Sequence, residues 1–182
     1  MNKFYHLKLK HEIVPIILGK EIGFPRLKDS GIYLAVKMVD TKKERTQLAL
    51  IDVPDEFPRF FHMSDENGQY IILLDDIIRL HLDNIFSIFS YDQAEAFTFK
   101  FTRDAELDLD DDISVSFMEK IRKSIKKRKV GEPVRFVYDP EMPEDLLEYL
   151  LSELNLKKGV NTIPGGRYHN FKDFMKLSLI HI

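Results

Sequence analysis

Residues 163–174 carry the residue types that best suit the binding of an anion. The Gly-Gly pair at 165–166 can adopt backbone angles that turn several N–H groups toward one anion. Arg167 offers a planar fork of donors for phosphate oxygens, and His169 and Lys172 add donors or positive charge close by. A structural interpretation fits the same residues: Pro-Gly-Gly forms a turn, and the aromatic side chains of the stretch anchor it to the core. Both interpretations stay open at this point.

Two runs of charge could also bind ions or polyanions. Residues 104–112 hold six carboxylates and no base, which suits Mg²⁺ or Ca²⁺, but they lack the glycine and terminal glutamate of a calcium loop. Residues 119–129 hold seven bases and one acid, which could suit polyphosphate or nucleic acid. We predict a helix over about 112–129, and acids at its start and bases at its end match the helix macrodipole without any ligand. This simpler explanation is the one we adopt for both runs.

Several common catalytic and metal-binding patterns are absent from the sequence. It has no cysteine, which excludes disulfides and thiolate metal sites. Its six histidines show no i,i+4 pair of the zinc-helix kind, and His81 falls on the apolar side of a predicted helix, where we expect a packed residue. No P-loop, Gly-x-Gly-x-x-Gly or Gly-x-Ser-x-Gly pattern occurs. The residues alone therefore indicate no catalytic residue and no metal ligand.

The elements that must position these residues change in type along the chain. Apolar runs predict a β-rich first half, arranged as a meander. The clearest half-buried strand is predicted at 94–102, where three phenylalanines share one face. A helix is predicted to begin at Asp75 and another at Pro143. The other strands are predicted at 32–38, 47–53, 59–63, 70–74 and 134–138.

Length and composition suit a single compact domain. The chain has 182 residues, of which 44% are hydrophobic and 31% charged. Strands that alternate with helices in the second half favour a mixed sheet. We therefore predict the α/β (α+β) class, a layered domain whose mixed β-sheet is flanked by helices. The net charge of -3 argues against a nucleic-acid partner, and no apolar run is long enough for a membrane span.

The motif Ile163-Pro-Gly-Gly-Arg-Tyr-His-Asn-Phe-Lys-Asp-Phe174 resembles the signature of the long bacterial polyphosphate kinases. Further segments are similar to the central part of that family in the same order, namely 32–36, 73–79, 82–86, 102–106 and 132–138. The resemblance covers roughly residues 4–174. It implies a single domain at 1–174 that resembles the family's middle, or head, domain, followed by a tail of uncertain origin at 175–182.

The resemblance implies an enzyme that reversibly transfers the terminal phosphate of ATP to polyphosphate, using Mg²⁺ and a phosphohistidine. In that family the phosphorylated histidine and most of the ATP pocket lie in C-terminal domains, and His169 matches a different histidine. We therefore expect no catalytic residue in this segment, no activity from it alone, and neither Mg²⁺ nor ATP bound to it. The family's head domain is associated with dimerisation and with the wall of a polyphosphate tunnel. Our candidates for contacts with polyphosphate are Arg103, Arg135, Arg167, His169 and Lys172.

The partners that the resemblance implies are the N-terminal and C-terminal domains of the same enzyme, polyphosphate, and further copies of the chain in a homo-oligomer. The implied location is the cytoplasm, with peripheral membrane association of the full-length enzyme left open. Two alternatives remain. The chain could be a free-standing, non-catalytic polyanion-binding module, whose binding would weaken steeply with salt. It could also be a complete small phosphotransferase that uses His169, although no nucleotide-phosphate cradle accompanies that histidine.

Overall fold

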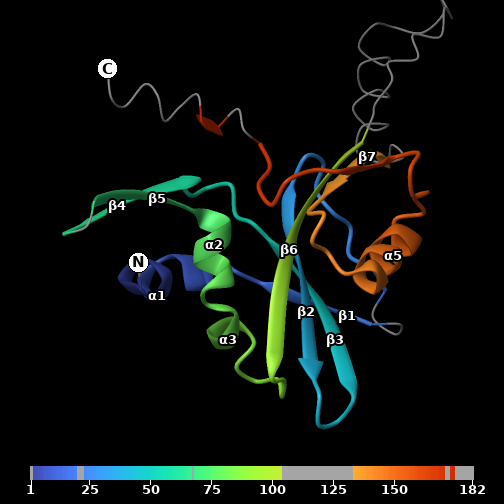
Figure 1. Cartoon of the computed structure of the whole chain (residues 1–182), viewed down its shortest axis with the longest axis horizontal. Helices are drawn as coiled ribbons and strands as arrows, with labels where there is room; N and C mark the ends of the chain where they lie inside the picture. The colour runs from blue at the N-terminus through green and yellow to red at the C-terminus, as the bar shows by residue number, and fades with distance from the viewer. Residues whose placement is uncertain (1, 20–22, 67, 104–132, 171–172, 175–182) are drawn as a thin grey trace, which may run out of the picture.

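Figure 1 shows the computed structural model of the chain, which describes residues 2–19, 23–66, 68–103, 133–170 and 173–174. A six-stranded sheet runs through the molecule in the order β1-β3-β2-β6-β7-β8. Neighbouring strands are antiparallel except for β7 and β8, which are parallel. The strands are β1 (Pro15–Leu18), β2 (Ile32–Asp40), β3 (Arg45–Asp52), β6 (Gln93–Arg103), β7 (Pro133–Tyr138) and β8 (Thr162–Pro164).

Helices lie on both sides of this sheet (Figure 1). On one side are α1 (Asn2–Leu7), α2 (Leu74–Arg79) and α3 (Leu82–Ile85), and on the other is α5 (Glu144–Glu153). The predicted α/β (α+β) fold, a layered domain with a mixed sheet flanked by helices and a strand-rich first half, is confirmed.

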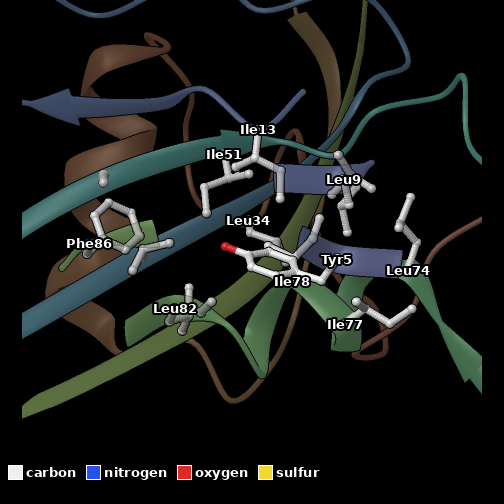
Figure 2. Close-up of a cluster of buried hydrophobic side chains, with 14 of the residues drawn as sticks. Tyr5, Leu9, Ile13, Leu34, Ile51, Leu74, Ile77, Ile78, Leu82 and Phe86 are labelled. Atoms are coloured by element: carbon white, nitrogen blue, oxygen red, sulfur yellow. The ribbon is translucent and has the colours of Figure 1, made fainter. Parts of the chain in front are cut away.

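Alternate side chains of the strands build a core on each face of the sheet. Leu34 of β2 and Ile51 of β3 point into the cluster around α2, which Figure 2 shows together with Tyr5 of α1. The neighbouring residue Tyr33 points the other way, into the cluster under α5. The three phenylalanines of β6 lie in that second cluster, and none is more than 8% exposed. Their shared face confirms the prediction from the period of two, and burial of each ring stabilises the fold by about 1.5–3 kcal/mol.

The predicted β-meander is wrong, although its strands exist. β1 pairs with β3 and not with β2, so β3 has neighbours on both of its edges. The chain that leaves β3 after Asp52 therefore finds no open edge beside it. After the loop that contains Pro54 and Pro58, it forms β4 (Phe60–Asp65) and β5 (Gly68–Leu73), a separate antiparallel hairpin.

The helix predicted to begin at Asp75 is two short helices. α2 ends at Arg79, and His81 has backbone angles of φ -115° and ψ 17°, outside the helical region, before α3 begins. Ile78, Leu82 and Phe86, which recur at helical spacing in the sequence, are nevertheless buried (Figure 2). His81 stacks on the ring of Tyr5 at 3.7 Å between centroids, so it is a packed residue as expected.

Some predictions lie outside the described residues: the helix at about 112–129, both charge runs, Lys172 and the tail at 175–182. Within the described part of the chain, no helix is long and apolar enough to cross a membrane.

Candidate functional site

The Gly-Gly turn of the 163–174 segment lies against the end of β7. The N–H group of Gly165 donates a hydrogen bond to the carbonyl oxygen of Tyr138 at 2.8 Å. A Cβ atom on Gly165 would lie 2.6 Å from Cγ1 of Val137 and 3.2 Å from Cε1 of His169. Both distances are too short for an undisturbed contact, so the close approach of the segment to the sheet requires glycine at 165. The N–H group of Gly165 is thus used by the sheet, which supports the structural interpretation at this residue.

The next residues of the segment reach α2 and meet Asp76. The hydroxyl of Tyr168 donates to Oδ2 of Asp76 at 2.7 Å, and Nη2 of Arg167 lies 3.5 Å from Oδ1. Nη1 of Arg79, one turn along the helix, donates to the same Oδ1 at 2.9 Å. We call these four residues the Asp76 cluster. It joins α2 to residues that are 91 and 92 positions later in the sequence.

Arg79 ties the Asp76 cluster to the sheet. Its Nε donates to the carbonyl oxygen of Ala96 at 2.9 Å, and its Nη2 donates to Oγ1 of Thr98. Both acceptors belong to β6, and the side chain of Arg79 is only 9% exposed. The guanidinium therefore makes directed contacts with a helix and a strand at once, which few side chains other than arginine can do. Asp76 is fixed as a result.

A second, buried ion pair lies beside the Asp76 cluster. Nη2 of Arg59 is 2.8 Å from Oδ2 of Asp75, and the two side chains are 13% and 0% exposed. Burial raises the pKa of Asp75 above its usual range, although Arg59 and Arg79 act in the opposite direction. The carbonyl of Arg59 also accepts the N–H group of Leu74 at 2.9 Å. This pair connects the start of β4 to the start of α2.

His169 lies beneath the 163–174 segment and not on its surface. It is 8% exposed, and its Nε2 has no hydrogen-bond partner among the described residues. Burial lowers the pKa of His169, and the charges of Arg59 and Lys100 act in the same direction. A hydrogen bond with the backbone of Thr98 raises the pKa, but by less than burial lowers it. The imidazole is therefore neutral near pH 7 and packs as part of the support for the segment.

The structure places the other candidate cations at different points of the sheet. Arg167 keeps 46% of its side chain exposed at the Asp76 cluster. Arg135 is exposed on β7 and pairs in register with Thr102 of β6. The guanidinium carbon of Arg103 lies 5.2 Å from the ring centroid of Phe101, at the end of β6. Arg79 of the Asp76 cluster contacts β6 at Thr98. Thr102, which pairs with Arg135, and Arg103 are four and five residues further along β6, which is roughly 13–17 Å at the usual rise per residue of a strand.

Sequence reasoning missed the residues that hold the segment in place. Lys100 of β6 donates to Oδ1 of Asn170 at 2.6 Å, and Asn170 has a left-handed φ of 61°. The signal that could have found Lys100 is the polar side of β6, where Thr98 and Lys100 alternate with the buried phenylalanines. Asp76 and Arg79 are an i,i+3 pair of opposite charge on a short helix, which is also readable from the sequence.

A cavity of about 610 Å³ opens beside this site. Arg59 and Asn170 lie in its lining together with the ion pair between Lys28 and Asp52, whose charged atoms are 2.8 Å apart. Four aspartates (Asp29, Asp52, Asp55 and Asp173) outnumber Lys28 and Arg59 in its lining, so the cavity does not support an anion site. No group of three histidine, aspartate or glutamate side chains within the described part of the chain could hold a metal ion.

Comparison with known proteins identifies the family. Residues 1–177 match the family model described as the polyphosphate kinase middle domain. The polyphosphate kinase of Vibrio parahaemolyticus is 41% identical over 181 residues, covering 96% of this chain and 26% of that protein. The polyphosphate kinase of Escherichia coli K12 is 39% identical over the same length, with the same coverage. The crystal structure of the polyphosphate kinase from Porphyromonas gingivalis matches with a TM-score of 0.72 and 25% identity, over 96% of this chain and 24% of that one.

The chain therefore spans about a quarter of the length of these relatives. The matched residues include the Gly-Gly turn, the Asp76 cluster and every strand described above. The resemblance carried by the 163–174 motif is confirmed, and the chain belongs to the polyphosphate kinase family as its middle domain.

Proposed function

We propose that this chain serves as the middle domain of an enzyme that reversibly transfers the terminal phosphate of ATP to polyphosphate. In this role it supplies a surface for assembly and part of a cationic wall along which polyphosphate passes. It contributes no catalytic residue. The names of its relatives support the reaction.

The oriented and partly exposed side chain of Arg167 is the observation that supports the proposed cationic wall. Its guanidinium is directed by Asp76 on one side, and almost half of the side chain remains exposed. A planar guanidinium with several outward donors suits phosphate oxygens. Polyphosphate carries about one negative charge per unit, so a wall must offer cations at intervals without trapping the chain. Arg167, Arg135 and Arg103 come from separate elements, as such spacing requires, and we propose Lys172 as a fourth contact.

His169 supports the absence of chemistry in this domain. A phosphoryl acceptor must meet ATP, whereas His169 is only 8% exposed beneath the segment. We propose that His169 acts on polyphosphate indirectly, by holding the segment that carries Arg167. We propose that the other domains of the enzyme bind Mg²⁺ and ATP.

We further propose a cytoplasmic homo-oligomer whose partners are the other domains of the same enzyme and polyphosphate. Several large apolar side chains support a covered surface, because exposed apolar area often marks an interface. Leu7, Leu80 and Ile88 are 74%, 66% and 87% exposed. Sedimentation velocity of the purified chain at several concentrations tests self-association, and a monomer at all of them contradicts it.

The test of the proposed function compares this chain with the Escherichia coli polyphosphate kinase. Both are assayed for ATP-dependent polyphosphate synthesis and for the reverse reaction, with Mg²⁺ present. We expect activity from the homologue and none from the chain. Synthesis by the chain itself would refute the proposal and make His169→Ala the next variant to assay.

The wall is tested separately by polyphosphate binding to the chain. We expect the double variant Arg167→Ala/Lys172→Ala to bind more weakly than the unsubstituted chain. The control is the double variant Lys42→Ala/Lys43→Ala, two exposed lysines in the turn between β2 and β3, because it removes the same number of positive charges without touching the segment. Equal losses in variant and control would show only a general charge effect and would refute the assignment.

A further inference from the structure

The geometry points to Asp76 as a positioning residue: through the Asp76 cluster it fixes the direction in which Arg167 presents its guanidinium to polyphosphate. This inference rests on the proposed function, because it concerns how one cation of the wall is held. Asp76 itself touches no phosphate and acts only through Arg167.

Both oxygens of the Asp76 carboxylate are used, and for different purposes. Oδ2 accepts the hydroxyl of Tyr168 at 2.7 Å, which anchors the residue next to Arg167. Oδ1 lies 3.5 Å from Nη2 of Arg167, which orients the guanidinium without enclosing it. Burial and the hydrogen bond with Asp76 raise the pKa of Tyr168, so its hydroxyl stays protonated and remains the donor.

Asp76 can direct a neighbour because it is itself immobile. Oδ1 also accepts Nη1 of Arg79 at 2.9 Å, and Arg79 is bonded in turn to the backbone of Ala96 and the hydroxyl of Thr98. A continuous series of directed contacts therefore runs from β6 through Arg79 and Asp76 to Arg167. Its starting point is β6, an interior strand that is paired with β2 on one edge and β7 on the other.

The backbone on both sides of Arg167 is also held. Gly165 is bonded to the end of β7, and Asn170 is bonded to Lys100 of β6. His169 is buried between these two points. With the backbone held in this way, rotation of the long Arg167 side chain is the main motion left, and the contact with Asp76 restricts that rotation.

Positioning and simple charge make opposite predictions for Asp76. A carboxylate beside Arg167 cancels part of the positive charge there, so charge alone predicts that its removal strengthens the binding of a polyanion. Positioning predicts that removal weakens binding, because the guanidinium must then be ordered by the ligand at an entropic cost. Asp76→Asn removes the charge, whereas Asp76→Glu keeps the charge and moves the carboxylate by one methylene group.

The experiment measures the Kd of the chain for inorganic polyphosphate of defined length over a range of NaCl concentrations. We expect Arg167→Ala, Asp76→Asn and Asp76→Glu each to weaken binding by roughly two- to fivefold, the range of an exposed ion pair. The slope of log K against log salt should fall by up to about 1 in Arg167→Ala, as for the loss of one phosphate contact. In the Arg167→Ala background, Asp76→Asn should cause no further loss.

Several results would overturn the inference. Tighter binding by Asp76→Asn with unchanged binding by Asp76→Glu would show a charge effect alone. A full additional loss from Asp76→Asn in the Arg167→Ala background would show that Asp76 acts on the fold and not through Arg167. If Arg167→Ala weakens binding but neither Asp76 variant does, the proposed wall stands and the role of Asp76 is refuted. If the chain binds no polyphosphate, or Arg167→Ala binds normally, the wall itself is refuted together with this inference.

A second measurement needs no ligand and separates orientation from stability. The ¹⁵N relaxation of Nε of Arg167 reports how strongly the guanidinium is ordered on the picosecond-to-nanosecond timescale. We expect an ordered Nε in the unsubstituted chain and a clearly more mobile one in Asp76→Asn at a temperature where both are fully folded. Equal order in the two proteins would show that Asp76 does not position Arg167.

Discussion

Replacement of Arg59 by methionine tests the buried ion pair that connects β4 to α2. The substitution keeps an unbranched apolar side chain and removes the guanidinium that lies 2.8 Å from Asp75. Asp75 is 0% exposed, so its carboxylate is left in the interior without its nearest counter-charge. Removing one partner of a buried pair costs about 3–5 kcal/mol, which is a large part of the ~5–15 kcal/mol that stabilises a typical domain.

The same pair distance occurs at the surface, which supplies a matched control. Nζ of Lys28 lies 2.8 Å from Oδ2 of Asp52, but these side chains are 66% and 31% exposed. Because solvent screens such a pair, Lys28→Met should cost at most about 1 kcal/mol. For a domain of this size, Arg59→Met should lower the Tm by roughly 6–20 °C, and Lys28→Met by no more than about 4 °C. Thermal unfolding followed by circular dichroism measures both.

The pH dependence of Arg59→Met gives a second signature. Burial already raises the pKa of Asp75 in the folded chain, and loss of Arg59 raises it further. A carboxyl whose pKa is higher in the folded state is stabilising when protonated, and the folded state loses stability as the pH rises through that pKa. The deficit of Arg59→Met should therefore be largest near neutral pH and shrink toward about pH 4. A deficit that is independent of pH, or no larger than that of Lys28→Met, refutes this account of the pair.

Two further predictions concern single side chains. Gly165→Ala should cost about 1–3 kcal/mol by overpacking, since its Cβ would lie 2.6 Å from Cγ1 of Val137. Gly166→Ala, whose Cβ would meet nothing closer than 3.9 Å, is the control, and equal urea unfolding of the two variants contradicts the packing argument. Burial, with the hydrogen bond to Asp83, raises the pKa of Tyr91 from 10.0 to about 12, so absorbance titration should find a late-ionising phenol that Asp83→Asn shifts down. The folded state should lose stability between about pH 10 and 12, where only the unfolded Tyr91 ionises, and a Tyr91 that titrates with the exposed tyrosines would contradict the assignment.

Local sequence patterns predicted a strand or helix correctly where one of its faces is clearly apolar. The strand at β6 follows from its alternating phenylalanines, because a period of two allows only one arrangement with all three rings buried. The helix at α5 was predicted from Pro143, and it begins one residue later at Glu144, with Leu146, Leu147, Leu150 and Leu151 buried. In these segments, residues close together in the sequence are enough to predict the type of element and its buried face.

The predictions were wrong where the structure depends on contacts between residues far apart in the sequence. Pairing of β1 with β3 was not predictable from either strand alone, and it is this pairing that removed the edge needed for a meander. At the break, His81 stacks on Tyr5 of α1, a residue 76 positions earlier that the local pattern does not reveal. At the candidate site, the motif of residues 163–174 predicted which side chains matter, but the partner of Arg167 is 91 residues earlier. Periodicity carries no information about a contact at that separation.

The length of the connection in the Asp76 cluster has a consequence for synthesis of the chain. Asp76 is made 91 residues before Arg167, which at the usual pace of translation is a delay of about 5–18 seconds. During that time α2 and β6 can fold, but Asp76 has only Arg79 as a partner. The cluster can therefore close only after β7, α5 and β8 have been made. Because β8 ends at Pro164, every strand of the sheet is made before Arg167, and the arginine proposed to face polyphosphate takes up its orientation after them.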